Sequence, residues 1–163
     1  MNIRRVYEYA LQREHEGRDF FLSNAERMSH GAAKGVFLRL AEEEQKHIRF
    51  IEAMLASLNA DEGAEGLGTD LLLHRDRFAG RAESELLDQT VIESMIPDVT
   101  ILRMAYLIER DFAEFYEMAA GRADGAAQQA LAELAKWERS HERLFKDLHD
   151  RVFEEYAQMP WGG

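Results

Sequence analysis

Apolar residues recur at intervals of three and four along most of this 163-residue chain, the spacing of helices that bury one face. The pattern predicts a first helix over about Arg4–Met28 and a second whose apolar stripe covers Phe37–Leu58. A third helix is predicted over about Pro97–Ala120, because proline suits the first turn of a helix. After a turn at Gly121–Gly125, a fourth helix is expected to end before Pro160.

The predicted helices pair into two hairpins, separated by a long connection at about residues 59–96. The beginning of this connection is rich in glycine and polar residues, which break the helical spacing. Two hairpins joined in this way predict an all-α fold, a four-helix bundle whose halves are linked by a crossover. We expect a single domain over residues 1–163, because no boundary separates two independent cores.

Polar residues interrupt the apolar stripes of the second and fourth helices at positions that face the core. Glu44 and His47 lie in the second stripe, and Glu138 and His141 lie in the fourth. A buried carboxylate is costly at such a position unless it has a partner. Residues i and i+3 of a helix project side by side, so each Glu-x-x-His element can direct an oxygen and a nitrogen to one region.

These residues belong to a longer pattern that occurs twice along the chain. The first copy consists of Glu14, Phe21, Glu44 and His47, and the second consists of Glu109, Tyr116, Glu138 and His141. The offsets between the copies are 95, 95, 94 and 94 residues, which indicates an internal duplication. Each copy therefore contributes one glutamate from the first helix of a hairpin and a Glu-x-x-His element from the second.

Four carboxylates and two imidazoles that face one another across a bundle predict a site for two metal ions. Two divalent cations would balance the four negative charges, whereas without metal each close pair of carboxylates would repel by about 4 kcal/mol. Oxygen ligands with one imidazole per metal suit Fe or Mn, with Zn possible, and iron would favour redox chemistry over hydrolysis. The alternative is a set of satisfied core polar groups, with a cation such as Arg18 reaching in.

Composition and charge narrow the class of protein. The chain has no cysteine, which excludes disulfides, thiolate-bound zinc and iron–sulfur clusters, so a metal must sit on oxygen and nitrogen ligands. A formal net charge of −11 repels phosphate backbones and anionic membranes, so we expect no nucleic-acid or membrane partner. Because no apolar run approaches the length of a membrane span or a signal peptide, we expect a cytoplasmic protein.

The duplicated pattern resembles the ferritin-like di-iron carboxylate proteins, and in particular their rubrerythrin-like branch, over about residues 4–155. The segment Leu40–His47 is especially similar to the second helix of that branch. The resemblance implies two iron ions held by six residues, Glu14, Glu44, His47, Glu109, Glu138 and His141. In this arrangement Glu44 and Glu138 would bridge the ions, while Glu14 and Glu109 would each be terminal.

The resemblance also implies a non-haem di-iron oxidoreductase that reacts with peroxide or dioxygen, or that oxidises Fe(II). Two features depart from the branch. Rubrerythrins proper carry a further carboxylate one turn after the glutamate of the third helix, where this chain has Phe112. They also carry a cysteine-ligated rubredoxin iron, so this cysteine-free chain, which lacks a rubredoxin domain, would need an external electron-donor protein.

Two other functions remain open at the level of sequence. One is an iron-binding or storage protein of ferritin type, and the other is a metal-free helical scaffold that binds a partner. We expect a homo-oligomer in either of the metal-binding cases. A dimer is favoured and would suit an enzyme, whereas a particle of many subunits would suit storage.

Side chains outside the six are assigned by their position. Tyr116, two turns beyond Glu109, could serve the site, by hydrogen-bonding a carboxylate or taking part in electron transfer, or it could only pack. Its counterpart Phe21 would make the site asymmetric. Trp137 is expected to pack against the bundle or at an interface. Surface positions are expected for Glu16, Glu114, His15, His30, His74 and His149, and a disordered tail is expected at residues 159–163.

Overall fold

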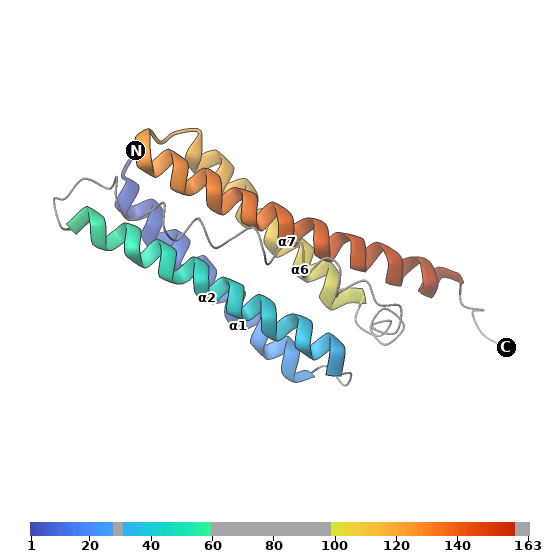
Figure 1. Cartoon of the computed structure of the whole chain (residues 1–163). Coiled ribbons are helices and arrows are strands. Elements are labelled where there is room, and N and C mark those ends of the chain that lie inside the picture. Colours follow the sequence, from blue (N-terminus) through green and yellow to red (C-terminus); the bar gives the residue numbers. More distant parts are fainter. Residues whose placement is uncertain (28–30, 60–98, 159–163) are drawn as a thin grey trace.

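The computed structural model describes residues 1–27, 31–59 and 99–158. These residues form four helices, α1 (Ile3–Arg27), α2 (Gly31–Asn59), α6 (Val99–Ala120) and α7 (Gly125–Gln158) (Figure 1). The predicted all-α four-helix bundle is confirmed, and the helix ends agree with the predicted ones to within a few residues. The crossover predicted at about residues 59–96 lies outside the described residues except for Asn59, the last residue of α2, and the tail at 159–163 lies outside them too.

The helices pack as two hairpins, α1 along α2 and α6 along α7. In Figure 1, α1 and α7 run in the same direction, while α2 and α6 run in the opposite one. The end of α2 and the beginning of α6 therefore lie at opposite ends of the bundle. This is the arrangement expected when a crossover links the two hairpins.

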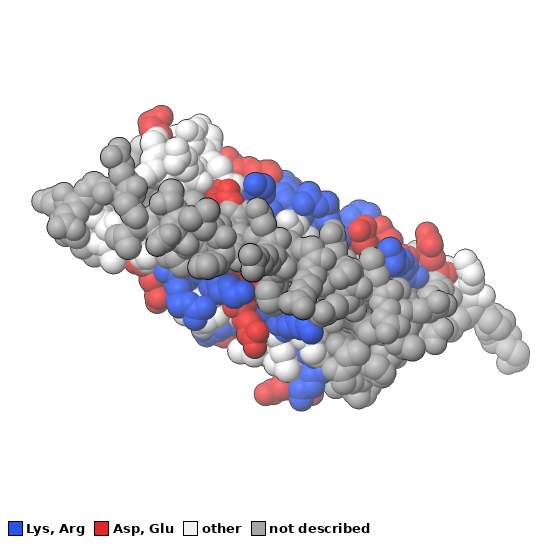
Figure 2. Space-filling model, in the orientation of Figure 1, with Lys and Arg blue, Asp and Glu red and all other residues white. Residues whose placement is uncertain are grey.

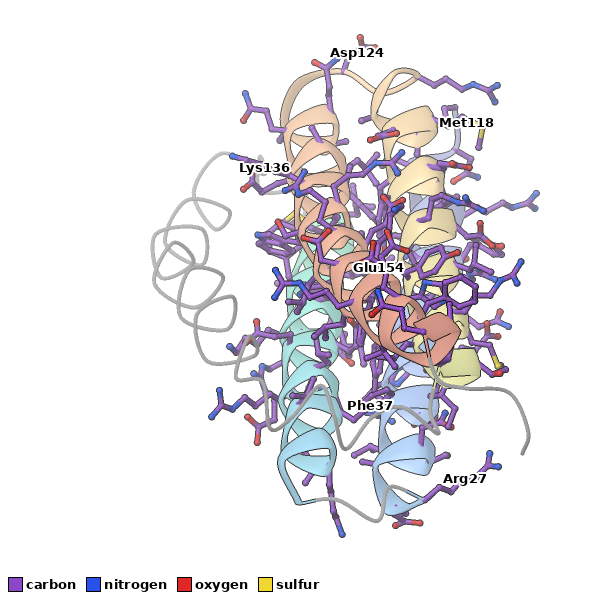
Figure 3. The ribbon with its side chains drawn as sticks, turned by 90° about the vertical axis from the view of Figure 1, so that its right-hand side faces the viewer. Arg27, Phe37, Met118, Asp124, Lys136 and Glu154 are labelled. Carbon is purple, nitrogen blue, oxygen red and sulfur yellow. The ribbon has the colours of Figure 1, made fainter. Side chains whose placement is uncertain are left out.

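Local hydrogen bonds explain where the helices begin and end. The side-chain oxygen of Asn2 accepts a hydrogen bond of 3.2 Å from the backbone N–H of Arg5, which caps the first turn of α1. The turn after α6 is closed by the N–H of Gly121, which donates to the carbonyl of Glu117 at 3.0 Å. Gly125 then starts α7 at a φ of +57°, a conformation that favours glycine. Figure 3 shows Asp124 of this turn at the opposite end of the bundle from Arg27.

The buried apolar side chains form two clusters at successive levels of the bundle. The first joins Phe21, Phe37, Leu40, Leu102, Leu144, Phe145, Leu148, Val152 and several alanines. The second joins Tyr7, Phe50, Ile51, Met54, Phe112, Tyr116, Leu131, Leu134 and several alanines. On each helix, the Glu or Glu-x-x-His positions fall between the residues of one cluster and those of the other. One predicted core position is wrong, because Leu58, in the last turn of α2, is 37% exposed.

The described outer surface carries charged side chains together with single exposed apolar ones such as Met104, Met118 and Phe153. Figure 2 shows basic and acidic side chains interspersed on the described part of one face. None of the helices in the described ranges combines the length and the apolar character that a bilayer span requires.

Candidate metal centre

The side chains of all six residues predicted from the duplicated pattern meet in the layer between the two apolar clusters. They come from every helix, with Glu14 on α1, Glu44 and His47 on α2, Glu109 on α6, and Glu138 and His141 on α7. The four glutamates are at most 1% exposed and His47 is 3% exposed. Only His141 is less completely buried, with 14% of its side chain exposed.

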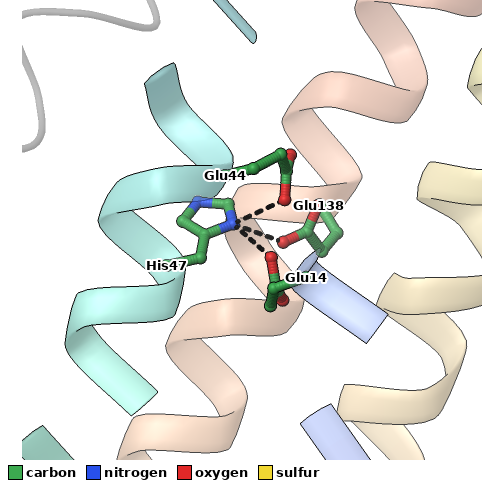
Figure 4. Close-up of side chains that lie close together, drawn as sticks. All are labelled: Glu14, Glu44, His47 and Glu138. Carbon is green, nitrogen blue, oxygen red and sulfur yellow. Dashed lines mark hydrogen bonds and ion pairs between the residues drawn. The ribbon is translucent and has the colours of Figure 1, made fainter. Parts of the chain in front are cut away.

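The first half of the cluster is centred on His47 (Figure 4). Its Nδ1 lies 2.9 Å from Oε1 of Glu138 and 3.1 Å from Oε2 of Glu14. The same nitrogen lies 3.5 Å from Oε2 of Glu44. These four side chains each offer one ligand atom, and the four atoms lie within 4.8 Å of one another.

The second half is centred on His141. Its Nδ1 lies 3.5 Å from Oε2 of Glu109 and 3.6 Å from both Oε1 of Glu44 and Oε2 of Glu138. Here too one atom from each of the four side chains falls within 4.8 Å of the others.

Glu44 and Glu138 are common to both halves. Each turns one carboxylate oxygen toward His47 and the other toward His141. Glu14 belongs only to the first group and Glu109 only to the second. Two shared carboxylates therefore lie in the middle of the cluster, with one further carboxylate and one imidazole on either side. This arrangement can accommodate two cations side by side.

Buried oxygens in this cluster lack the partners that buried polar groups normally have. Within the described residues, no hydrogen bond from outside the cluster reaches either carboxylate oxygen of Glu44, Glu109 or Glu138. Leaving a buried oxygen unsatisfied costs about 1–3 kcal/mol, and more when it is charged. The donor set of oxygens and imidazole nitrogens, with unsatisfied oxygens aimed at a common centre, fits divalent Fe, Mn or Zn.

Burial and mutual repulsion control the pKa values of the carboxylates. Burial, and then the charges of Glu138 and Glu14, hold the pKa of Glu44 well above its ordinary value. The pKa of Glu109 is raised in the same way, by burial and by Glu138 and Glu44. Burial would also raise the pKa of Glu138, but the neighbouring His47 and His141 outweigh it and lower this pKa. Without metal, protons on Glu44 and Glu109 therefore reduce the negative charge of the layer.

Burial acts on the pKa values of the two imidazoles in the opposite sense, but their net shift is again upward. Burial alone would lower the pKa of His47, but Glu138, Glu14 and Glu44 outweigh burial and raise it. The pKa of His141 is also raised, because Glu138 and Glu44 outweigh its burial. Both effects show how strongly the layer attracts positive charge, which a metal ion would supply.

Aromatic side chains surround the first half of the cluster. The hydroxyl of Tyr116 donates a hydrogen bond to Oε1 of Glu14, which decides between the two alternatives for this residue. Trp137 is partly buried and packs against the second apolar cluster, as one of its two alternatives predicted, and it stacks on His47 with ring centroids 4.8 Å apart. The ring of Phe21 instead stacks on Phe145 at 5.5 Å.

Other predicted positions are confirmed in part. Glu16 and Glu114 are solvated, with 54% and 60% of their side chains exposed. Arg18 does not enter the layer, because its guanidinium donates to Gln45 and Asp19 instead.

Surface positions were predicted for His15 and His149, and both residues are partly exposed rather than fully solvated. Only 14% of the His149 side chain is exposed, because its ring stacks on Phe153 and meets the edge of Tyr106. His15 is half-buried, and neither of these residues belongs to the cluster. His30 and His74 lie outside the described residues.

A contact that the sequence analysis missed lies one turn along α1 from Glu14. A Cβ atom on Gly17 would lie 3.0 Å from Cε2 of Phe112 and 3.7 Å from Oε2 of Glu44. The Phe112 ring is 3% exposed, and the guanidinium of Arg13 lies over it, 4.8 Å from the ring centroid. The Phe112 ring therefore covers the polar layer where α1 contacts α6, and it occupies space that Gly17 leaves open. The sequence feature that could have indicated this contact is a glycine inside a predicted helix, because glycine there lowers helix stability by about 1 kcal/mol relative to alanine.

We expect Gly17→Ala to destabilise the protein by about 1 kcal/mol, although alanine favours helices. The added methyl group overlaps a phenylalanine that is covered on its outer side and cannot retreat freely. Urea unfolding of the metal-free protein measures the change. Gly35→Ala is the control, because nothing lies within 4 Å of a Cβ at that position and alanine should stabilise α2. A gain in stability for both variants would contradict the tight contact with Phe112.

A family model described as Rubrerythrin matches residues 6–149, a range that includes all six residues of the cluster. No curated protein gives a significant match, and neither does any solved structure.

Proposed function

Because this chain belongs to the rubrerythrin family, we propose that its buried cluster binds two iron ions and that the loaded protein is an oxidoreductase. Its small substrates are peroxide or dioxygen, or Fe(II) as the species oxidised. The observation that carries the proposal is the pair of shared carboxylates, each with one oxygen toward either imidazole. Manganese or zinc would suit the same donor set, but only a redox-active metal supports this chemistry.

Each residue has a definite part in holding the ions. Glu44 and Glu138 would be shared by the two ions, because these two carboxylates belong to both groups of ligand atoms. Glu14 and His47 would complete the ligands of one ion, and Glu109 and His141 would complete those of the other, so that these two glutamates would each serve a single ion. When bound, two iron ions supply the two electrons that reduction of peroxide requires. The apolar clusters on either side keep the layer dry, which strengthens the electrostatic hold on both ions.

The redox groups that these residues lack indicate what kind of partner the protein needs. Without cysteine these 163 residues cannot hold a rubredoxin-type iron, and we propose that a separate donor protein supplies the electrons. We propose a cytoplasmic homo-oligomer, with a dimer as the favoured state. Light scattering distinguishes such a dimer from the many-subunit particle of a storage protein.

Anaerobic titration of metal-free protein with Fe(II) is expected to saturate at two ions per chain, one for each group of ligand atoms. Addition of peroxide or air should then oxidise the bound iron, and a supplied reductant should sustain many turnovers. Saturation well below two ions, measured by elemental analysis, would contradict the proposal. Uptake of many irons per chain without sustained turnover would indicate storage instead.

A further inference from the structure

The surroundings of the two proposed metal positions differ. We call the one between Glu14 and His47 the first position, and the one between Glu109 and His141 the second position. Building on the proposed function, we propose that the first position binds its ion more tightly and fills first, whereas the second binds more weakly and exchanges its ion. We further propose that the hydroxyl of Tyr116 is the main cause of this difference.

The terminal carboxylates are held to different extents. Oε1 of Glu14 accepts the hydrogen bond of Tyr116, which leaves Oε2 aimed at Nδ1 of His47, 3.1 Å away. Neither oxygen of Glu109 accepts a hydrogen bond from outside the cluster within the described residues, and its approach to His141 is longer, at 3.5 Å. The first position is therefore pre-organised by a hydrogen bond from a side chain that is not itself a ligand, whereas the hydrogen-bond partner of Glu109 is Glu138, itself one of the six proposed ligands.

The imidazoles differ in the same direction. His47 stacks with Trp137 at 4.8 Å and with His141 at 5.6 Å, and only 4% of its side chain is exposed. For His141, 14% of the side chain is exposed, and its one described ring contact is with His47. The second position therefore has the shorter path to solvent, which favours exchange of its ion.

This asymmetry arises from differences between the two copies of the duplicated pattern. Tyr116 corresponds to Phe21, which has no hydroxyl to offer Glu109. Trp137 corresponds to Glu43, whose carboxylate lies 2.5 Å from Lys46 instead of stacking on an imidazole. Both differences favour the first position, so the chain has one firmly held set of ligands and one loosely held set.

Stepwise titration of the metal-free protein with Co(II) tests the inference, because binding heat can be measured without any redox step. Loss of a partner that orients a metal ligand typically weakens binding about 10- to 100-fold. We therefore expect two steps in the wild-type protein, and we expect Tyr116→Phe to weaken the tight step by about 10- to 100-fold while the weak step changes less than about threefold. Tyr7→Phe is the matched control. Tyr7 is buried in the same apolar cluster, and burial alone raises its pKa to about 12, so no carboxylate of the layer acts on it.

Two further variants assign the steps to the positions. His141→Ala should keep one tightly bound Co(II), whereas His47→Ala should leave only weak binding. Circular dichroism is the control and should show that both variants stay helical. Equal affinities in the wild-type protein, equal effects of Tyr116→Phe on both steps, or the reverse result for the two histidines would each overturn the inference. In each of these three cases the wild-type protein would still bind two ions, so the proposed function would stand. A wild-type protein that binds no Co(II) would remove both.

Discussion

Glu44→Gln is expected to reduce metal binding at least about 100-fold while the metal-free protein keeps nearly its full stability. Both oxygens of Glu44 face imidazoles, one in each half of the cluster, so this one side chain serves both positions. An amide cannot replace a carboxylate that bridges two cations, because it carries no charge and only one of its two polar atoms accepts. In the metal-free protein, however, burial and neighbouring charges raise the pKa of Glu44, so a neutral amide resembles the protonated acid already present.

Elemental analysis after dialysis against the metal, together with urea unfolding of the metal-free protein, measures both parts of this prediction. Glu42→Gln is the matched control, because Glu42 is exposed on the same helix two residues away. The control should bind metal like the wild-type protein. A Glu44→Gln variant that still holds two ions per chain would show that Glu44 is not shared, and a variant that unfolds without metal would show that the charged carboxylate has a structural role.

The metal-free protein is expected to lose at least about 2 kcal/mol of its free energy of unfolding between about pH 6 and about pH 8. The pKa values of Glu44 and Glu109 are raised above 4.5, and those of His47 and His141 are raised above 6.5. The folded chain therefore binds more protons than the unfolded chain over this range, and its stability falls as pH rises. Each additional proton that the folded chain keeps lowers the free energy of unfolding by about 1.4 kcal/mol for every pH unit of increase.

Glu138 acts in the opposite direction, but outside this window. Its pKa is lowered below 4.5, so its contribution is present above that value and is lost only as pH falls further. Metal binding displaces the protons of the layer, so the stability difference between loaded and metal-free protein should widen as pH rises.

Urea unfolding at a series of pH values, with and without metal, tests this dependence. Glu44→Gln should reduce the slope of the metal-free protein by about 1.4 kcal/mol per pH unit, because one of the retained protons is gone. The exposed Glu42→Gln should not change the slope. A metal-free protein whose stability is flat or rises over this range would show that the carboxylates are not held in a dry, mutually repelling layer.

Both predictions depend on a polar layer that lies between two apolar clusters. The layer has unsatisfied carboxylate oxygens where a bundle of this kind could have had leucine. The clusters above and below hold the four helices in register, which keeps the repelling groups close together without metal. The cost to the metal-free fold is what makes the layer attract cations strongly.

Several features could be predicted from particular residues of the chain. Glu44, His47, Glu138 and His141 were placed in the core because they occupy the apolar stripes of their helices. Glu14 and Glu109 were added because the duplicated pattern repeats them at a nearly constant offset, and the structure brings all six together. Helical spacing is a local property, so it indicates which face of a helix is buried without any knowledge of its neighbours.

Contacts between helices could not be predicted in the same way. Tyr116 hydrogen-bonds Glu14 on another helix and not Glu109 on its own, because seven residues separate those two by about 10 Å along the helix axis. Likewise, the space that Gly17 leaves for Phe112 and the stacking of Trp137 on His47 depend on how the hairpins meet. Nothing in the local spacing of either partner specifies these pairs.

The sequence by itself determined the helical class, the two hairpins and the identity of the inward-facing polar residues, because each depends on periodicity and on a repeat within one chain. Tertiary structure alone decided which oxygen faces which imidazole, and which half of the cluster Tyr116 and Trp137 contact. The physical reason is that these features depend on the register and rotation of packed helices, which are set by the combined packing of side chains from all four helices.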